Sequence, residues 1–520
     1  MRSVDIRPEA GELPSSFSER LGKSYAQQSS SKDKKNKGQF FTPVSIARFM
    51  GNLGHAQNGD ISILDPGCGC AVLSVALIEH LVDSGNCQSI FLDVYETDTE
   101  VIPFTTAALD YMKSWLTERN ITFSYTLYQD DFILSNSSCL EEEESLFGKQ
   151  AGKKYDFIIS NPPYFKLAKD DKRVKSVGKI VDGQTNIYAL FLSLSACMLN
   201  EGGQMIYITP RSFASGLYFQ SFRNHFFSKV AIEFIHLFNS RKGTFAKDDV
   251  LQELLIMSCR PVDFKNNGSI TVSFSEGSSD LDRSYRKDFP QSDIVNVESN
   301  EKVVYLPVCP KDEKVLGLFK SWDGNMAKYD IKISTGPVVA FRAYDYLEPE
   351  ETENTVPLYW LHNVVKMLSD HPVRKKDKCQ YIRVEDGSKA SLLPNKNYIF
   401  LRRFSSKDDN SRLVAAPYFG NSSKYQYVGV ENKLNYIYRP KGHLTRNEVM
   451  GIAALLNSEL FDTYFRTFNG NVNVSATELR MMPFPPIKTI REIGNKIILN
   501  NDYSIEFVNN VVNEFFNIQA

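Results

Sequence analysis

Residues 155–164 read Tyr-Asp-Phe-Ile-Ile-Ser-Asn-Pro-Pro-Tyr, an apolar run followed by a turn that two prolines lock. The run predicts a short buried strand, and in an open α/β sheet ligands bind at the carboxyl ends of the strands. The side-chain oxygen of Asn161 and the carbonyl of Pro162 can then face one point, with the flat ring of Tyr164 beside them. Two acceptors next to a ring favour a planar ligand with an exocyclic amino group, such as adenine or cytosine.

A second predicted strand, 61–64, ends in the small-residue turn Asp65-Pro66-Gly67-Cys68-Gly69-Cys70-Ala71, and a helical pattern covers 72–82. Small residues let a ligand approach the backbone, and the helix N-terminus offers free N–H groups. The carboxylate of Asp65 attracts an ammonium or sulfonium and repels a phosphate. The turn has neither the ending of a P-loop nor the spacing of a GxGxxG loop, so ATP and NAD both fit poorly.

Acidic residues also follow the next two predicted strands. The strand 90–95 ends at Glu96, the position from which an acid accepts hydrogen bonds from ribose hydroxyls. The strand 122–128 is followed by Asp131, which can accept from an adenine amino group, and by Phe132, which can pack on the ring. Each motif taken alone is also compatible with an ordinary structural turn.

The segment 38–43, Gly-Gln-Phe-Phe-Thr-Pro, precedes all of these motifs. The apolar spacing from Val44 onward predicts a helix. Thr42 is its expected N-cap, and Pro43 is the expected first helical residue.

Taken in order, the motifs resemble the gamma class of amino-methyltransferases, the TaqI-like adenine-N6 DNA methyltransferases, over residues 38–260. The resemblance rests on 39–43, 65–69, Glu96, Asp131-Phe132, 161–164, 186–191 and 202–208. Looser patterns at 334–339, 401–405 and 471–479 also resemble the PstI-type methyltransferases.

This resemblance implies a doubly wound, Rossmann-like α/β sheet with a C-terminal mixed α+β target recognition domain. It implies S-adenosylmethionine as cofactor and duplex DNA as partner. The cofactor site would comprise Phe41, Thr42, Pro43, Asp65, Gly67, Gly69, Glu96, Asp131, Phe132 and Asn161. The target adenine would meet Asn161, Pro162 and Tyr164, with Phe245 as the second ring of a sandwich. Ala71 departs from the pattern, because a glycine is usual there.

The implied reaction needs no nucleophile from the protein. Acceptors on the hydrogens of the adenine amine make its nitrogen more electron-rich, and in-line transfer then depends mainly on positioning. Methylation of cytosine at C5 would need a covalent Cys after a proline, but Cys309 precedes Pro310.

The composition is that of an intracellular enzyme. The chain has 520 residues, 42% of them hydrophobic, and no apolar stretch near the roughly 20 residues of a membrane span. Its eight cysteines form no CxxC pair and its seven histidines no HxxxH pattern, so we expect no metal and reduced thiols. We expect a cytoplasmic, nucleoid-associated monomer.

The net charge of −2 does not by itself suggest a DNA-binding protein, but the charge is uneven. Residues 365–446 hold 17 Lys and Arg against 7 Asp and Glu, with aromatic residues between them. Such a tract predicts contact with DNA phosphates, although a solvated face would look similar. The expected contacts are Arg374, Lys375, Arg402, Arg403, Lys424 and Arg439.

Four segments are expected along the chain. They are a polar N-terminal arm (1–37), a catalytic domain (38–262), a connection (263–300) and a target recognition domain (301–520). A capping box at Thr445 and Glu448 predicts a helix that runs to about Phe468.

Several alternatives remain open at this point. They are methylation of cytosine N4, methylation of adenine in RNA, and a specificity subunit without catalysis. Asn161 favours adenine over cytosine, and the complete motif set argues against lost catalysis. A separately encoded restriction endonuclease as partner also stays open.

Overall fold

The structure is a computed structural model, and its polypeptide divides into two compact units, Met1–Leu306 and Pro307–Ala520. The residues that it describes are 7–28, 41–140, 152–180, 185–238, 253–263, 268–376, 378–405, 409–470 and 472–518.

The first unit is built on a nine-stranded sheet with the order β3-β2-β1-β4-β5-β7-β6-β8-β9. Strands β1 to β5 are parallel, and β7 runs antiparallel to both β5 and β6. The strand order reverses between β1 and β4, and right-handed crossovers then place helices on both faces. The expected doubly wound α/β fold is therefore confirmed. The strands are β1 (Gly59–Asp65), β2 (Cys87–Tyr95), β3 (Thr122–Tyr128), β4 (Tyr155–Ser160), β5 (Leu199–Pro210), β6 (Val230–Phe238), β7 (Leu254–Pro261), β8 (Ser269–Ser275) and β9 (Tyr285–Pro290).

The helices of this unit form because their apolar side chains recur at helical spacing and are buried against the sheet or against each other. Around β1 and β2, for example, α3 packs on α4, and both contribute to the core. The helices are α1 (Pro14–Gln28), α3 (Val44–Gly51), α4 (Val72–Ser84), α5 (Ile102–Thr117), α6 (Phe132–Asn136), α7 (Lys172–Ser176), α8 (Ile187–Cys197), α9 (Gln220–Lys229) and α11 (Gln291–Ile294).

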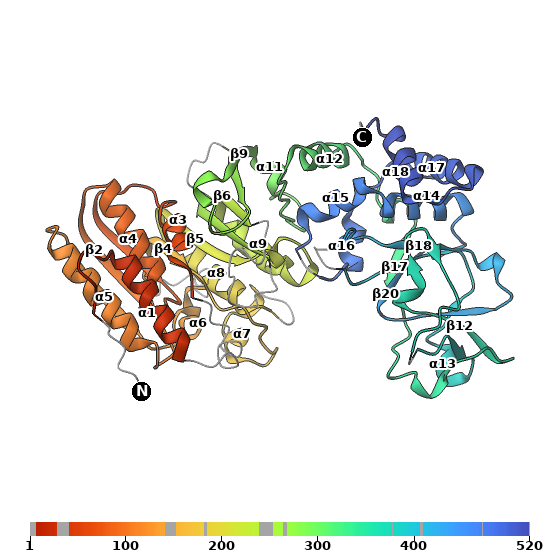
Figure 1. Cartoon of the computed structure of the whole chain (residues 1–520), viewed down its shortest axis with the longest axis horizontal. Helices are drawn as coiled ribbons and strands as arrows, with labels where there is room; N and C mark the ends of the chain where they lie inside the picture. Colours follow the sequence, from red (N-terminus) through yellow and green to blue (C-terminus); the bar gives the residue numbers. More distant parts are fainter. Residues whose placement is uncertain are drawn as a thin grey trace, which may run out of the picture. The chain divides into compact units, whose positions relative to one another are not determined.

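The N-terminal segment differs from the expected polar arm. Residues 14–28 form α1, which packs against α4 and α5 (Figure 1). Phe17, Leu21 and Tyr25 recur every fourth residue and are buried. Their burial holds α1 on the catalytic unit, so the prediction of an arm over 1–37 was wrong for this part. The polar run 29–35 lies outside the described residues.

The segment 263–300, expected to be a connection, instead extends the sheet. β8 pairs in parallel with β6, and β9 pairs antiparallel with β8. Ile270 and Val272 of β8 are buried. The segment is therefore part of the first unit, because its alternating apolar residues cover core that β6 would otherwise expose.

The second unit is a mixed α+β structure. It contains a four-stranded sheet, β10-β20-β17-β18, a five-stranded sheet, β11-β15-β12-β19-β16, and the hairpin β13-β14. Its strands are β10 (Lys332–Thr335), β11 (Leu347–Glu348), β12 (Thr355–Tyr359), β13 (Val364–Val365), β14 (Leu368–Ser369), β15 (Tyr381–Arg383), β16 (Leu393–Pro394), β17 (Tyr398–Arg402), β18 (Ala415–Tyr418), β19 (Tyr427–Val430) and β20 (Leu434–Tyr438).

Helices α12 (Pro310–Lys320), α13 (Asp386–Lys389), α14 (Arg446–Asn457), α15 (Glu459–Phe468), α16 (Ala476–Met481), α17 (Ile487–Asn500) and α18 (Ile505–Phe515) complete this unit. The capping box of Thr445 and Glu448 begins α14 as predicted. The expected single helix is divided at Ser458, whose hydroxyl caps α15. In the described part of the chain, no helix is both long and apolar enough to cross a membrane.

Candidate functional site

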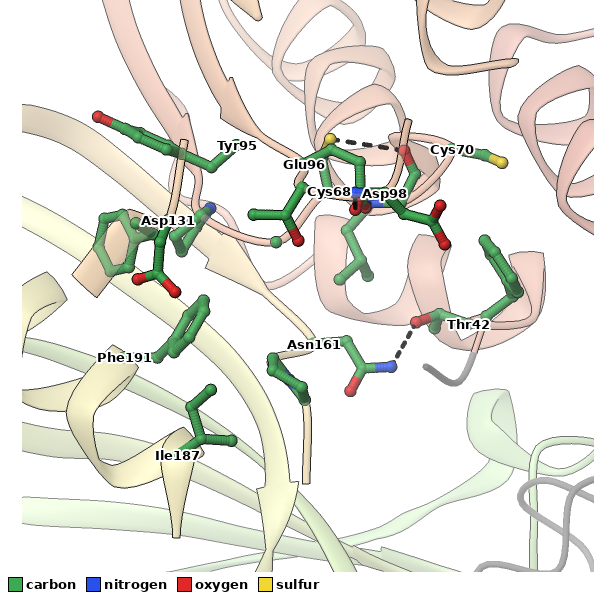
Figure 2. A pocket seen from close by; sticks show the side chains of 18 of the residues that line it. Thr42, Cys68, Cys70, Tyr95, Glu96, Asp98, Asp131, Asn161, Ile187 and Phe191 are labelled. Atoms are coloured by element: carbon green, nitrogen blue, oxygen red, sulfur yellow. Dashed lines mark hydrogen bonds between the residues drawn. The ribbon is translucent and has the colours of Figure 1, made fainter. Parts of the chain in front are cut away.

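A cavity of about 500 Å³ lies at the carboxyl ends of β1, β2 and β4 (Figure 2). Eight residues predicted from the sequence line it: Phe41, Thr42, Gly67, Gly69, Glu96, Asp131, Phe132 and Asn161. Pro43, Asp65, Pro162 and Tyr164 are described but are not part of the lining. Phe245 lies outside the described residues.

The turn after β1 presents its backbone to the cavity. Gly69 has φ +52°, and a Cβ there would lie 3.3 Å from the ring of Phe41, so a side chain would crowd the lining. Ala71 also has a left-handed backbone, with φ 62°, although it carries a methyl group. This conformation explains why a glycine suits the position that Ala71 occupies.

Helix α1 supports this turn from outside the cavity. The hydroxyl of Ser18 donates a short hydrogen bond to the carbonyl of Cys70. The hydroxyl of Tyr25 donates to Oδ2 of Asp98, 2.9 Å away, and Asp98 lines the cavity. The apolar spacing of Phe17, Leu21 and Tyr25 was the available signal for α1, which the sequence analysis did not predict, and these long-range contacts have no local signal.

Glu96 accepts two backbone hydrogen bonds at the cavity wall. Its Oε2 accepts from N–H of Gly69 at 3.1 Å, and its Oε1 accepts from N–H of Asp98 at 2.7 Å. Burial raises the pKa of Glu96, and these backbone donors oppose the rise. Each oxygen keeps a further lone pair, so the carboxylate can still accept hydrogen bonds from a pair of ligand hydroxyls.

Asp65 is completely buried, and neither of its carboxylate oxygens accepts a hydrogen bond of normal geometry within the described structure. Burial raises the pKa of Asp65 to about 7, although the nearby Ser74 hydroxyl and Gly67 N–H lower it. A buried carboxylate without strong partners favours a cationic group nearby. Asp65 does not line the cavity, so it could act on a ligand there only through its charge and not by direct contact.

Asp131 has a structural role that the sequence did not predict. Its Oδ1 caps α6 by accepting from the N–H groups of Ile133 and Leu134, at 2.9 and 3.1 Å. Its Oδ2 lies 3.8 Å from Nη1 of Arg173, which also lines the cavity. Only Oδ2 is thus left for a ligand.

The apolar side of the cavity is aromatic. Phe132 is buried, with its ring centroid 5.2 Å from that of Tyr95 and 5.1 Å from that of Phe191. Ile187 and Phe191 come from α8 and line the cavity as well. The α8 motif belongs to the family resemblance, but no cavity contact was predicted for these two residues. Their spacing of four residues, which places both side chains on one face of a helix, was the signal in the sequence that could have indicated them.

Asn161 is fixed by hydrogen bonds on both sides of its amide, of which Figure 2 shows the one to Thr42. Its Nδ2 donates to Oγ1 of Thr42, 3.0 Å away. Its Oδ1 accepts from the hydroxyl of Tyr164, which also contacts the Ile208 carbonyl at 2.9 Å. Burial holds the pKa of Tyr164 well above its usual range, so this hydroxyl remains a donor.

Thr42 is not the helix cap that the sequence predicted. Pro43 is the N-cap of α3 and has no side-chain hydrogen bond. Oε1 of Glu19 in α1 accepts instead from N–H of Val44, at 3.1 Å. The Thr42 hydroxyl is used to orient Asn161, a long-range contact that outweighs the local preference.

The predicted DNA-contacting residues of the second unit fall into two groups. Arg374, Lys375 and Lys424 are exposed, and Arg374 and Lys424 pair with the surface acids Glu350 and Glu351. Arg402 and Arg403 are half-buried and donate to the carbonyls of Val364 and Asn432.

For Arg439, the predicted contact with DNA was wrong. Its Nη1 lies 2.7 Å from Oε2 of Glu448, whose side chain is completely buried. Because this internal ion pair uses the guanidinium, Arg439 stabilises the second unit and is not available to DNA.

Among the described residues, no group of three or more His, Cys, Asp or Glu side chains is arranged to hold a metal ion.

The chain is similar to known methyltransferases of restriction–modification systems. Residues 88–245 match the Eco57I restriction-modification methylase family. The type II methyltransferase M.BsuBI of Bacillus subtilis is 33% identical over 470 residues, which cover 90% of this chain and 91% of the relative. M.PstI of Providencia stuartii is 28% identical and covers 88% and 89%. The structure of a DrdV–DNA complex is 15% identical, with a TM-score of 0.49 over 93% of this chain and 59% of the other.

At the identity and coverage shared with M.BsuBI, the chain belongs to the type II methyltransferases of restriction–modification systems, whose methyl donor is S-adenosylmethionine.

Proposed function

We propose that the chain transfers a methyl group from S-adenosylmethionine to N6 of an adenine that is rotated out of duplex DNA. The observation that carries this proposal is that Asn161 and Glu96 line one cavity. An acceptor suited to an exocyclic amine and an acid suited to ribose hydroxyls thus share one space, as transfer between two nucleosides requires.

The residues present fit the cofactor. Glu96 would accept from the ribose hydroxyls, the bare backbone at Gly69 would allow close approach, and the charge of Asp65 would attract the cationic methionine end. Phe132 and Oδ2 of Asp131 would contact the adenine, with Phe41 and Thr42 on the opposite side. When bound, the cofactor supplies an electrophilic methyl group on a positively charged sulfur.

Asn161 would activate the target amine. Its side-chain oxygen and the Pro162 carbonyl would each take a hydrogen of the amino group, which makes the nitrogen more electron-rich. The donor Tyr164 and the acceptor Thr42 hold the amide in the required orientation. The amine loses its proton after transfer, so no His or Cys base is needed. The ring of Tyr164 would lie against the base, opposite Phe245.

We further propose that the second unit holds the duplex through Arg374, Lys375, Arg402, Arg403 and Lys424. The exposed cations suit phosphate contacts. The half-buried Arg402 and Arg403 are held by backbone carbonyls, and such held side chains suit readout of base edges. Methylation of host DNA would place the enzyme in the cytoplasm at the nucleoid, where it would act as a monomer.

The test is transfer of labelled methyl groups to unmethylated bacterial DNA, followed by digestion and identification of the modified nucleoside. We expect N6-methyldeoxyadenosine from the natural protein. The Asn161→Ala variant should lose transfer by at least about a hundredfold, since electrostatic contacts to reacting groups contribute on that scale. It should bind S-adenosylmethionine within about tenfold of the natural protein, because a single lost hydrogen bond costs about that much. N4-methyldeoxycytidine as the product, or full activity of the variant, would contradict the proposal.

A further inference from the structure

An apolar tip stands out from the first unit just after β5. It consists of Leu217 and Tyr218, whose side chains are 57% and 70% exposed. Both belong to a short 3-10 turn, Leu217–Phe219, and the next residue, Phe219, is buried. Two large exposed side chains in sequence, fixed beside a buried one, are a feature typical of an interaction site.

Phe219, the residue after the tip, is connected to the target-base site by aromatic contacts. β5 lies beside β4, with Tyr207 opposite Ser160, and Tyr164 contacts the Ile208 carbonyl. Phe219 stacks on Tyr188, with ring centroids 5.8 Å apart, and Tyr188 meets Tyr164 edge-on at 6.4 Å. The tip therefore follows the strand end next to Asn161, and its neighbour Phe219 is two aromatic contacts away from Tyr164.

A buried arginine holds the loop that carries the tip. Arg223 of α9 is 1% exposed and donates to the carbonyls of Phe213, Ser215 and Gly216, at 3.0 to 3.1 Å. Its Nε donates to the carbonyl of Glu301, 2.7 Å away. A guanidinium placed among four carbonyls fixes the loop before any partner binds, so the tip loses little conformational entropy on contact.

Four lysines lie on the segment that follows the Asn161 motif and precedes α8. Lys166, Lys169, Lys172 and Lys175 follow the Asn161 motif and are exposed. Within the described part of the chain, none of the four forms an ion pair. The turn Gly178–Ile180, just after these lysines, and the tip turn both contact α9. Unpaired lysines on this segment complement a phosphate backbone.

We infer that the tip of Leu217 and Tyr218 enters duplex DNA beside the target adenine and occupies the space that the rotated base leaves. This inference rests on the proposed function and extends it to the partner surface of the same site. Rotation of a base out of a duplex costs unstacking and unpairing energy. An apolar side chain inserted between base steps offsets part of that cost, and the nearby lysines hold the strand.

The test compares two duplexes that carry the recognition motif. One is fully paired, and the other has an abasic site opposite the target adenine, so that no base pair must be broken. Single-turnover methylation is measured with saturating S-adenosylmethionine for the natural protein and for the double variant Leu217→Ala, Tyr218→Ala. The control is Tyr285→Ala, which removes an exposed tyrosine, 50% accessible, from the edge strand β9.

We expect the double variant to be slower by about tenfold on the paired duplex and by less than about threefold on the abasic duplex, because only the first requires unpairing. The ratio of the two rates does not depend on how much protein is folded. Equal losses on both duplexes, no loss on either, or the same pattern in Tyr285→Ala would overturn the inference. If the natural protein methylates neither duplex, the proposed function fails and the inference fails with it.

Discussion

The amide of Asn161 donates to the hydroxyl of Thr42 across 3.0 Å, although 119 positions separate the two residues in the chain. The contact joins the segment before α3 to the carboxyl end of β4. It directs Nδ2 toward Thr42 and leaves Oδ1 as the acceptor beside Tyr164. The orientation of the proposed amine acceptor is therefore set by a residue far from its own strand.

Removal of the Thr42 hydroxyl should slow methyl transfer. In Thr42→Val the shape is kept but the hydrogen bond to Asn161 is lost, which costs on the order of 1 kcal/mol and about a fivefold decrease in kcat. Thr42→Ser is the matched control, because it keeps the hydroxyl and should retain most of the activity. Single-turnover rates decide the matter: equal losses in both variants would mean that the methyl group of Thr42, not its hydrogen bond, is important.

Replacement of Ala71 by glycine should stabilise the protein. Ala71 has φ 62°, a conformation that costs an alanine about 1 kcal/mol more than a glycine. Part of this gain is offset by the greater freedom of glycine in the unfolded chain. The control Ala76→Gly lies inside α4 and should destabilise by about 1 kcal/mol or more. Urea unfolding measures both changes, and a destabilised Ala71→Gly variant would count against relief of backbone strain.

The stability of the protein should depend on pH through Asp65. Its pKa is raised from 3.8 to about 7 by burial, so the folded state binds the proton more tightly than the unfolded chain does. The contribution of this carboxyl to the free energy of unfolding is fully present below about pH 4 and is lost as pH rises through about 7. Between pH 5 and 8 the free energy of unfolding should fall relative to Asp65→Asn by on the order of 3 kcal/mol. If the free energy of unfolding depends on pH in the same way in the natural protein and in Asp65→Asn, the raised pKa of Asp65 is excluded as the cause.

The exposed and the internal arginines of the second unit should behave differently toward DNA. Arg374→Ala combined with Lys375→Ala should make the slope of log K against log salt shallower by about 1 to 2, because each lost phosphate contact contributes about 0.9. Arg439→Met should leave the slope unchanged. It should lower the free energy of unfolding by about 2 kcal/mol, since Glu448 keeps Arg491 as a partner. A changed salt slope for Arg439→Met would return that residue to the DNA interface.

Much of the first unit was predictable because its signals are local. The apolar runs before Asp65, Glu96 and Asn161 each form a strand of the parallel sheet, and their turns meet at one edge. Strand period and turn chemistry are properties of short segments, and the fold rule for open α/β sheets then brings the segments together.

The predictions from sequence that were wrong have a common physical cause, which is contact between residues far apart in the chain. Thr42 looked like a cap, but Glu19 provides the acceptor for α3, and Thr42 binds Asn161. Arg439 was predicted to belong to a basic surface, but its guanidinium pairs with the buried carboxylate of Glu448. The apolar residues Phe17, Leu21 and Tyr25 of α1 are spaced for one helix face, but the polar residues around them led to the prediction of an arm.

The most direct measurement is methylation-sensitive long-read sequencing of DNA from a methylation-free bacterial host that expresses the protein, beside the same host with Asn161→Ala. The account predicts N6-methyladenine at a single sequence motif with the natural protein and at none with the variant. Modified cytosine, unmodified DNA, or an adenine signal that survives in the variant would contradict the claim that Asn161 holds the amine of an adenine.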